Sequence, residues 1–113
     1  MFNPDVHTYQ APARNLWSAG VQTNVQLIAG VTGKKIVIDT IVISIGTLAS
    51  TVTFESGAAH TAVGPGFFMA VNTTQWITDL NIRLVEGANF EFSSTGVSTG
   101  CVYVEYHLES GNV

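Results

Sequence analysis

Charged residues are scarce in this chain, and that scarcity is the first constraint on what the protein does. Asp, Glu, Lys and Arg make up 11% of the 113 residues, against about 25% in ordinary soluble domains. A solitary monomer normally relies on surface charge to stay soluble. We therefore expect copies of the same chain, or a larger body, to cover much of the surface. The alternative to a covered surface is a neutral β-domain that is simply rich in threonine.

Basic residues are scarcer still. Only Arg14, Lys34, Lys35 and Arg83 are basic, and the formal net charge is −4. Nucleic-acid binding normally needs a clustered basic footprint. We therefore expect no nucleic-acid partner.

Cysteine and long apolar runs are also limited. The single Cys101 excludes an internal disulfide, and we expect it to be a small packed or interface residue. The most apolar stretch, residues 36–49, is interrupted by Asp39 and is shorter than the ~20 residues that span a bilayer. The first ten residues lack the basic head and apolar run of a secretory signal. We expect no membrane partner and synthesis in the cytoplasm.

The chain does contain stretches with the composition and alternating apolar residues that are typical of β-strands. Residues 33–49, GKKIVIDTIVISIGTLA, are rich in β-branched residues and contain no proline. Ile36 and Ile38 form one apolar row, and Ile41, Ile43 and Ile45 form another that is out of phase with the first. Side chains alternate faces with a period of two, so the phase changes near Asp39–Thr40. This change predicts either a bulge or a bend into a partner sheet.

The stretch 101–109, CVYVEYHLE, predicts a second long strand. Its core face holds Val102, Val104, Tyr106 and Leu108, and its other face holds Tyr103, Glu105, His107 and Glu109. We expect these two strands at the centre of a β-sandwich.

Shorter strand patterns fill the rest of the chain, with turn residues between them. They lie at 21–29, 51–56, 60–63, 67–71, 75–77, 81–85 and 90–93. In the first of these, Val25 and Leu27 are expected to face inward and Ile28 outward. Phe90 and Phe92 are expected inward and Glu91 outward, and residues 86–89 read as a hairpin connection with Gly87 at positive φ. About eight strands and no helix predict one all-β domain, a sandwich or barrel.

The N-terminal residues differ from this pattern. Residues 1–16 carry Pro4 and Pro12 and show no strong periodicity. We predict an extended arm over 1–16 that packs on something rather than forming a strand pair, followed by the β-sandwich domain over 17–113. Trp17 is the expected anchor where the two parts meet.

One constellation could carry chemistry. Glu105, His107 and Glu109 share a strand face, which could bind a metal or serve in acid–base catalysis. The two carboxylates would lie ~13 Å apart on a strand, too far to meet one ion. We therefore expect a solvated outer face. His7 and His60 have no His, Cys or carboxylate at ligand spacing and are expected in polar loop or edge positions.

Catalytic motifs are missing as well. The sequence shows no nucleophile elbow, and its Gly64-Pro65-Gly66 stretch lacks the lysine of a phosphate loop. We expect no enzyme, no metal and no cofactor. Four aromatic residues could face outward as a sugar-stacking platform, although packing explains each equally well: Tyr9, Trp17, Trp76 and Tyr103.

Five segments together resemble a known group of proteins. They are 33–38 (GKKIVI), 52–57 (VTFESG), 64–65 (GP), 84–90 (LVEGANF) and 100–106 (GCVYVEY). This pattern of strands and turns, over roughly residues 17–109, resembles small jelly-roll proteins on tailed-bacteriophage virions, especially trimeric capsid cement (decoration) proteins. The resemblance carries no active-site residues.

The resemblance implies an antiparallel two-sheet jelly roll that forms a homotrimer. Such a trimer would bind the major capsid protein on the outer surface of the phage head and stabilise the head. The arm residues that we expect to contact the capsid or a neighbour are Phe2, Pro4, Tyr9, Pro12, Arg14 and Trp17. Two other classes stay open, a trimeric phage fibre domain and a receptor- or carbohydrate-binding module.

Overall fold

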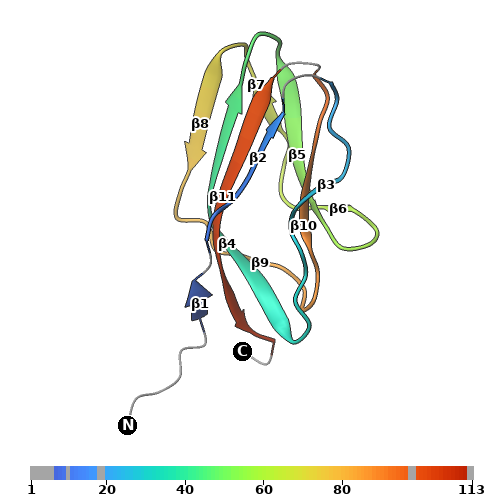
Figure 1. The fold of residues 1–113 in the computed structure, drawn as a ribbon, viewed down its shortest axis with the longest axis vertical. Coiled ribbons are helices and arrows are strands. Elements are labelled where there is room, and N and C mark those ends of the chain that lie inside the picture. The colour runs from blue at the N-terminus through green and yellow to red at the C-terminus, as the bar shows by residue number, and fades with distance from the viewer. Residues whose placement is uncertain (1–6, 10, 18–19, 97–98, 112–113) are drawn as a thin grey trace.

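The computed structural model describes residues 7–9, 11–17, 20–96 and 99–111, and these form an all-β sandwich (Figure 1). The side chains of residues 7–9 and 17 lie outside this description. The described residues form eleven strands: β1 (His7–Tyr9), β2 (Ala13–Trp17), β3 (Val25–Ile28), β4 (Lys34–Ile45), β5 (Ser50–Ser56), β6 (Thr61–Ala62), β7 (Phe67–Met69), β8 (Thr73–Ile77), β9 (Ile82–Arg83), β10 (Phe90–Ser94) and β11 (Gly100–Ser110). Within the described ranges, no helix is long and apolar enough to cross a membrane.

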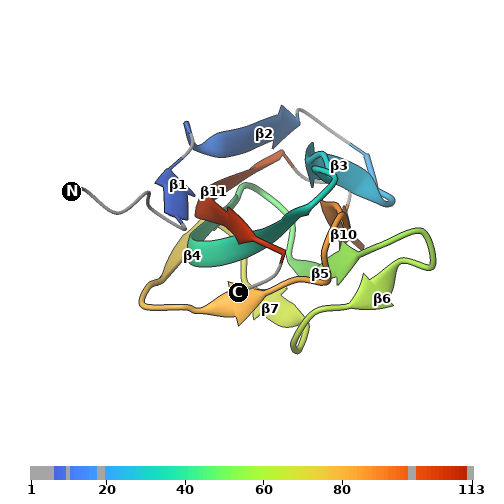
Figure 2. The same ribbon diagram turned by 90° about the horizontal axis from the view of Figure 1, so that it is seen from below.

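The strands form two antiparallel sheets that lie as two layers when viewed from below (Figure 2). In the six-stranded sheet, β11 pairs with β4, both β1 and β2 pair with the other edge of β11, and both β8 and β9 pair with the other edge of β4. In the five-stranded sheet, β10 lies between β3 and β5, and both β6 and β7 pair with β5. The two longest strands, β4 and β11, therefore lie at the centre, as the sequence predicted.

The pairing order is that of a jelly roll. Grouping β1 with β2, β6 with β7 and β8 with β9 leaves eight strand positions along the chain. The six-stranded sheet then has the order first, eighth, third, sixth, and the five-stranded sheet the order second, seventh, fourth, fifth. The predicted two-sheet sandwich of about eight strands is confirmed.

A bulge in β4 explains the change of phase along the central strand. Thr40 pairs with Glu105 and Ile38 pairs with Tyr106, so Asp39 is an extra residue without a partner in the register. The extra residue restores the alternation, and both Ile38 and Ile41 point into the core. Of the two predicted explanations, the bulge is correct.

Aromatic rings fill the space between the sheets. Phe54 and Phe90 are stacked, with ring centroids 5.3 Å apart, and Phe67 meets Phe54 edge to face at 5.9 Å. Val102 and Val104 of β11 cover this layer from the other sheet and are fully buried. Burial on this scale is the main stabilising term in a domain without disulfides.

The strand over residues 21–29 is shorter than predicted and contains a bulge. Phe90 pairs with Ile28, but the next residue, Glu91, pairs with Gln26, so Leu27 is an extra residue and the register shifts within β3. Ile28 is consequently buried in the core. The prediction that Ile28 faces outward is wrong, because simple alternation cannot continue through a bulge.

Residues 86–89 do not form a hairpin connection, which corrects a second prediction. β9 belongs to the six-stranded sheet and β10 to the five-stranded sheet, so this segment crosses from one layer to the other. Gly87 does have the expected positive φ, 78°. Gly30 lies against it so closely that an added Cβ would stand 2.0 Å from the Gly87 carbonyl oxygen.

The predicted arm differs from expectation in its described part. β1 and β2 are extended, but they pair with β11 of the same chain, from His7 opposite Glu109 to Trp17 opposite Gly100. The expectation that this segment forms no strand pair is therefore wrong for these residues. The unpaired edge of a long central strand offers a ladder of main-chain groups, and residues with little side-chain periodicity can still pair with it.

Candidate interaction surface

The outer face of the six-stranded sheet brings together more of the predicted functional residues than any other described surface of the molecule. Side chains of β11 alternate, so Val102 and Val104 point into the core while Tyr103, Glu105, His107 and Glu109 point to the outer face. The bulge at Asp39 divides this face in two. One half carries a buried ionic network, and the other half is exposed and largely uncharged.

The ionic network is centred on His107. Its Nδ1 lies 2.8 Å from Asp39 Oδ2, and its Nε2 lies 3.0 Å from Glu109 Oε2. The His107 residue is 7% exposed and Glu109 is 1% exposed. The prediction of a solvated outer face is therefore wrong for these two residues. The contact between His107 and Asp39 spans 68 positions, which no local pattern could show.

Arg83 completes the network from the edge of the sheet. Its Nε and Nη2 donate to the two carboxylate oxygens of Glu109 at 3.0 and 3.1 Å, and Nη1 donates to Asn81 Oδ1 at 3.0 Å. Val37 lies between Arg83 and His107 in the pairing register and is fully buried. The forked contact with Glu109 is the geometry in which a guanidinium holds a carboxylate most firmly.

The contacts shift the pKa values of this cluster in opposite directions. Burial works against a charged imidazole, but hydrogen bonds with Asp39 and Glu109 outweigh it and raise the pKa of His107 above its ordinary 6.5. The hydrogen bond with His107, together with Arg83 and against the effect of burial, lowers the pKa of Glu109 below its ordinary 4.5. A protonated imidazole can donate from both ring nitrogens at once, which matches its two carboxylate partners.

The hydrogen bonds of this network occupy the polar atoms of both His107 and Glu109. Both ring nitrogens of His107 and both oxygens of Glu109 are in hydrogen bonds, and Glu105 instead accepts one from the Tyr103 hydroxyl at 2.9 Å. The two carboxylates proposed for a metal therefore do not converge. In the described part of the chain, no group of three or more His, Cys, Asp or Glu residues is placed to hold a metal ion.

The exposed half of this face carries two rows of side chains that cross four strands. We call these two rows the exposed strip. The first row runs from β8 to β2 as Trp76, Val42, Tyr103 and Arg14. The second row runs beside it as Thr74, Ser44, Cys101 and Leu16.

The strip exposes large apolar side chains. Trp76 is 68% exposed and Leu16 is 65% exposed. Tyr103 and Cys101 are half-buried between them. Burial raises the pKa of the Cys101 thiol and nearby Arg14 partly offsets the rise, so this cysteine stays neutral.

The structure places the predicted arm residues separately. Arg14 lies exposed in the strip, and Pro12 lies exposed between β1 and β2. Tyr9 is opposite His107 in the register and Trp17 is opposite Gly100, although their side chains lie outside the described part. Phe2 and Pro4 lie outside the described residues altogether. Trp76 and Tyr103, which the sequence analysis offered as outward aromatic residues, do lie on the outer face.

The five-stranded sheet has a polar outer face of its own. Glu91 is 5% exposed, and its oxygens lie 2.6 Å from His60 Nδ1 and 3.0 Å from Asn89 Nδ2. Ser93 donates to Glu55 Oε1 at 2.9 Å. His60 therefore has a carboxylate partner, which sequence spacing could not reveal because 31 positions separate the two residues.

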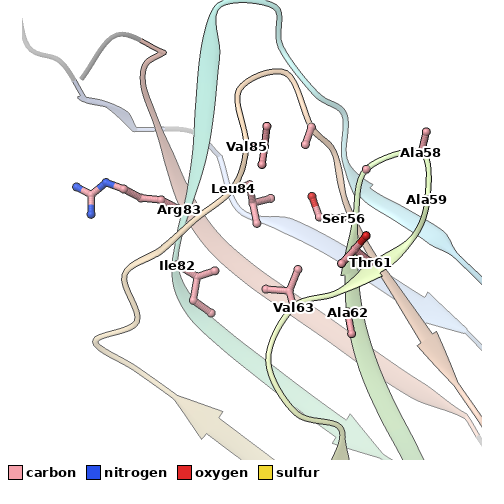
Figure 3. Close-up of a pocket in the computed structure, with 12 residues that line it drawn as sticks. Ser56, Ala58, Ala59, Thr61, Ala62, Val63, Ile82, Arg83, Leu84 and Val85 are labelled. Atoms are coloured by element: carbon pink, nitrogen blue, oxygen red, sulfur yellow. The ribbon is translucent and has the colours of Figure 1, made fainter.

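A groove of about 500 Å³ opens between β6 and β9, where the two sheets part (Figure 3). Its lining is mostly apolar, and Val63, Ile82 and Leu84 line it from opposite sides. Arg83 belongs to the rim, but its guanidinium points away from the groove toward Glu109. The lining therefore presents no acid–base pair.

Comparison with known proteins identifies the fold and no more. No family model matches the chain, and no curated protein matches it. A solved chain from Bacillus endospore appendages, described as a novel family of disulfide-linked pili, aligns with a TM-score of 0.53. The alignment covers 92% of this chain and 89% of that chain, at 11% identity. At this identity the likeness shows a shared β-sandwich fold.

Proposed function

We propose that this protein is a structural virion component, a decoration (cement) protein that binds the outside of a bacteriophage head as a homotrimer and stabilises it. The observation that carries the proposal is the distribution of exposed apolar side chains over several faces of a weakly charged domain. Trp76 and Leu16 lie on one sheet, Phe68 is 85% exposed on the other, and Val85 is 77% exposed beside the groove.

An assembly subunit needs more than one contact surface, because it must meet both its own copies and a larger body. Monomeric proteins rarely leave large apolar patches uncovered, and interfaces favour aromatic residues at their centres. Separate exposed apolar side chains on separate faces fit a subunit that is covered from several directions. The resemblance to cement proteins supplies the phage head as the larger body.

The test is binding to capsids of the same phage that were assembled without this protein. We expect the full chain to co-sediment with these capsids and to raise their melting temperature, because a ligand of the assembled shell stabilises that shell. Light scattering of the free protein should give 36 kDa, three times 12.0 kDa. A trimer that neither sediments with capsids nor stabilises them would overturn the decoration role.

The contribution of the first ten residues needs a variant that keeps β2 and the rest of the six-stranded sheet. A chain beginning at Ala11 removes β1 but retains β2, which pairs with β11 over Ala13–Trp17. We expect this variant to remain trimeric and to bind capsids more weakly. Equal capsid binding by the full and shortened chains would leave the proposed decoration role standing. It would show that residues 1–10 do not contribute to capsid binding.

A subunit of a filament or fibre is the second candidate, and the shared fold with a pilus subunit favours it. Such a filament could not be linked by disulfides alone, because each copy has one cysteine and a single thiol can join only two copies. Filaments seen by electron microscopy, together with absent capsid binding, would favour this candidate.

A further inference from the structure

The two ends of the first row of the exposed strip carry side chains that complement each other. Its four members occupy one register line across β8, β4, β11 and β2, with Trp76 and Arg14 at the ends and Val42 and Tyr103 in the middle. A cation is therefore placed at one end and an aromatic ring at the other. These two groups attract each other strongly when a guanidinium lies over the face of an indole ring.

We propose that two copies of this chain pack face to face through the exposed strip, related by a two-fold axis that runs parallel to the strands between β4 and β11. This inference rests on the proposed assembly role and narrows it. The axis exchanges the position of β8 with that of β2, and the position of β4 with that of β11. Trp76 then faces Arg14 of the second copy, and Val42 faces Tyr103 of the second copy.

A two-fold contact uses each complementary pair twice. Two Arg14–Trp76 pairs close the ends, and two Tyr103–Val42 pairs fill the centre. Stacked sheets lie ~10 Å apart, a distance that long arginine, tryptophan and tyrosine side chains can fill from both sides. In the second row, Leu16 faces Thr74 of the second copy, which covers the other large apolar side chain.

Charge supports a second copy as the occupant. Within the strip Arg14 is the only charged residue, and Glu105 lies one row beyond Tyr103 at its margin. A partner with a basic face would leave Arg14 opposed by like charge, whereas the two-fold arrangement places each Arg14 on an uncharged ring. Glu105 remains at the rim, where interfaces are polar and hydrated.

The size of the strip sets the expected strength. Four strands ~4.8 Å apart, with two rows ~7 Å apart along each strand, give a patch of about 300 Å² once side chains are included, which is smaller than the ~800 Å² that each partner buries in a typical specific interface. We therefore expect association in the micromolar range. Several such contacts in one assembly would act together.

The arrangement does not pair the cysteines. Cys101 faces Ser44 of the second copy, so the two Cys101 Cα atoms would be separated by the ~10 Å between sheets and by one strand spacing of ~4.8 Å sideways, about 11 Å in all. A disulfide needs Cα atoms closer than about 7 Å. Association should therefore be the same with and without reducing agent.

The experiment is sedimentation velocity under reducing conditions from 5 to about 500 µM, a range around the expected dissociation constant. We expect the 36 kDa homotrimer, three times 12.0 kDa, to double to 72 kDa as the concentration rises, because the strip joins two trimers. A 24 kDa species, twice 12.0 kDa, would support the two-fold contact and contradict the homotrimer. Trp76→Arg should raise the dissociation constant of the two-fold contact at least tenfold, since it sets Arg14 against a second cation. The double change Trp76→Arg with Arg14→Trp restores the alternation of ring and cation and should recover association.

Phe68→Arg is the matched control, because it makes the same change at an exposed aromatic residue of the other sheet. It should leave the two-fold contact unchanged. A 36 kDa species that never doubles would overturn this inference and leave the homotrimer standing. Failure of the double variant to recover association, or an equal effect of Phe68→Arg, would also overturn it. Capsid binding, measured separately, decides the proposed function.

Discussion

At the scale of single residues, His107 has the most closely defined surroundings in the described molecule. It lies between the carboxylates of Asp39 on β4 and Glu109 on β11, while Arg83 from β9 holds Glu109 from the far side. Ionic hydrogen bonds on the outer face therefore connect three strands of the sheet, β4, β9 and β11. The strength of these bonds depends on the protonation of His107 and Glu109.

The sign of the pH dependence follows from the pKa directions. The pKa of His107 is raised above 6.5, so its contribution to stability is complete below pH 6.5 and is lost as pH rises through the folded-state value. The pKa of Glu109 is lowered below 4.5, so its contribution is present above pH 4.5 and is lost as pH falls through the folded-state value. The network therefore stabilises the fold most between these two limits.

We expect the melting temperature of the wild type to fall by several degrees as pH rises from 6 toward 8.5. His107→Gln should be less stable at pH 6 and should lose most of this pH dependence. Cys101 does not interfere, because burial raises the pKa of its thiol above 9.0. His60→Gln is the control, since His60 also contacts a carboxylate but its side chain is 43% exposed. Parallel pH profiles for wild type and His107→Gln would contradict this interpretation.

At the scale of elements, the bulge in β4 decides which residues the central strand presents to the core. Residues 34–38 are in phase with the core only because Asp39 is an extra residue. Without it, Ile36 and Ile38 would move to the outer face and Lys35 and Val37 would turn inward.

Deletion of Asp39 should therefore unfold the protein or lower its melting temperature by more than 10 °C. Full burial of an isoleucine side chain is worth about 1.5–3 kcal/mol, and the deletion would expose two of them while burying Lys35. Asp39→Asn is the control: it keeps the extra residue, removes one charge and should remain folded. Circular dichroism melting distinguishes these outcomes, and a deletion variant as stable as the wild type would show that the register does not depend on Asp39.

Sequence pattern was sufficient where a strand is long and one of its faces is buried. The rows Ile36–Ile38, Ile41–Ile45 and Val102–Val104 identified the centre of one sheet, and the change of phase located the bulge. Pattern failed at Ile28, where a second bulge has no polar residue to mark it, and over 7–17, where pairing depends on the free edge of β11. Main-chain hydrogen bonds hold such strands whatever their side chains.

The outer face was harder to predict than the core. The alternation on β11 correctly placed His107 and Glu109 on that face, but it could not show that Asp39 and Arg83 cover them. Those partners are 68 and 26 positions away, and only the sheet topology brings them together. The exposed strip is hidden for the same reason, because Arg14, Val42, Trp76 and Tyr103 come from four separate strands.

At the scale of the whole molecule, nearly every strand pairs with a strand that is distant along the chain. β1 and β2 pair with β11, and β3 pairs with β10. Such pairings require large loops to close before contacts form, and proteins of this kind fold in milliseconds to seconds. Refolding after a denaturant jump, followed by tryptophan fluorescence, should therefore be slower than about 1 ms, with kinetics set by the six-stranded sheet. Completion within a shorter mixing time would contradict this expectation.

The position of β11 between β2 and β4 also has a consequence for the nascent chain during its synthesis on the ribosome. Gly100 lies 55 residues after Ile45, so the apolar strand β4 leaves the exit tunnel well before the strand that protects it exists. At about 5–20 residues per second this delay lasts several seconds. Neighbouring nascent chains on one messenger could pair through β4 during that interval. Slower translation of residues 46–99 would lengthen the exposure, and a chaperone that holds nascent chains would matter most before Gly100 is made.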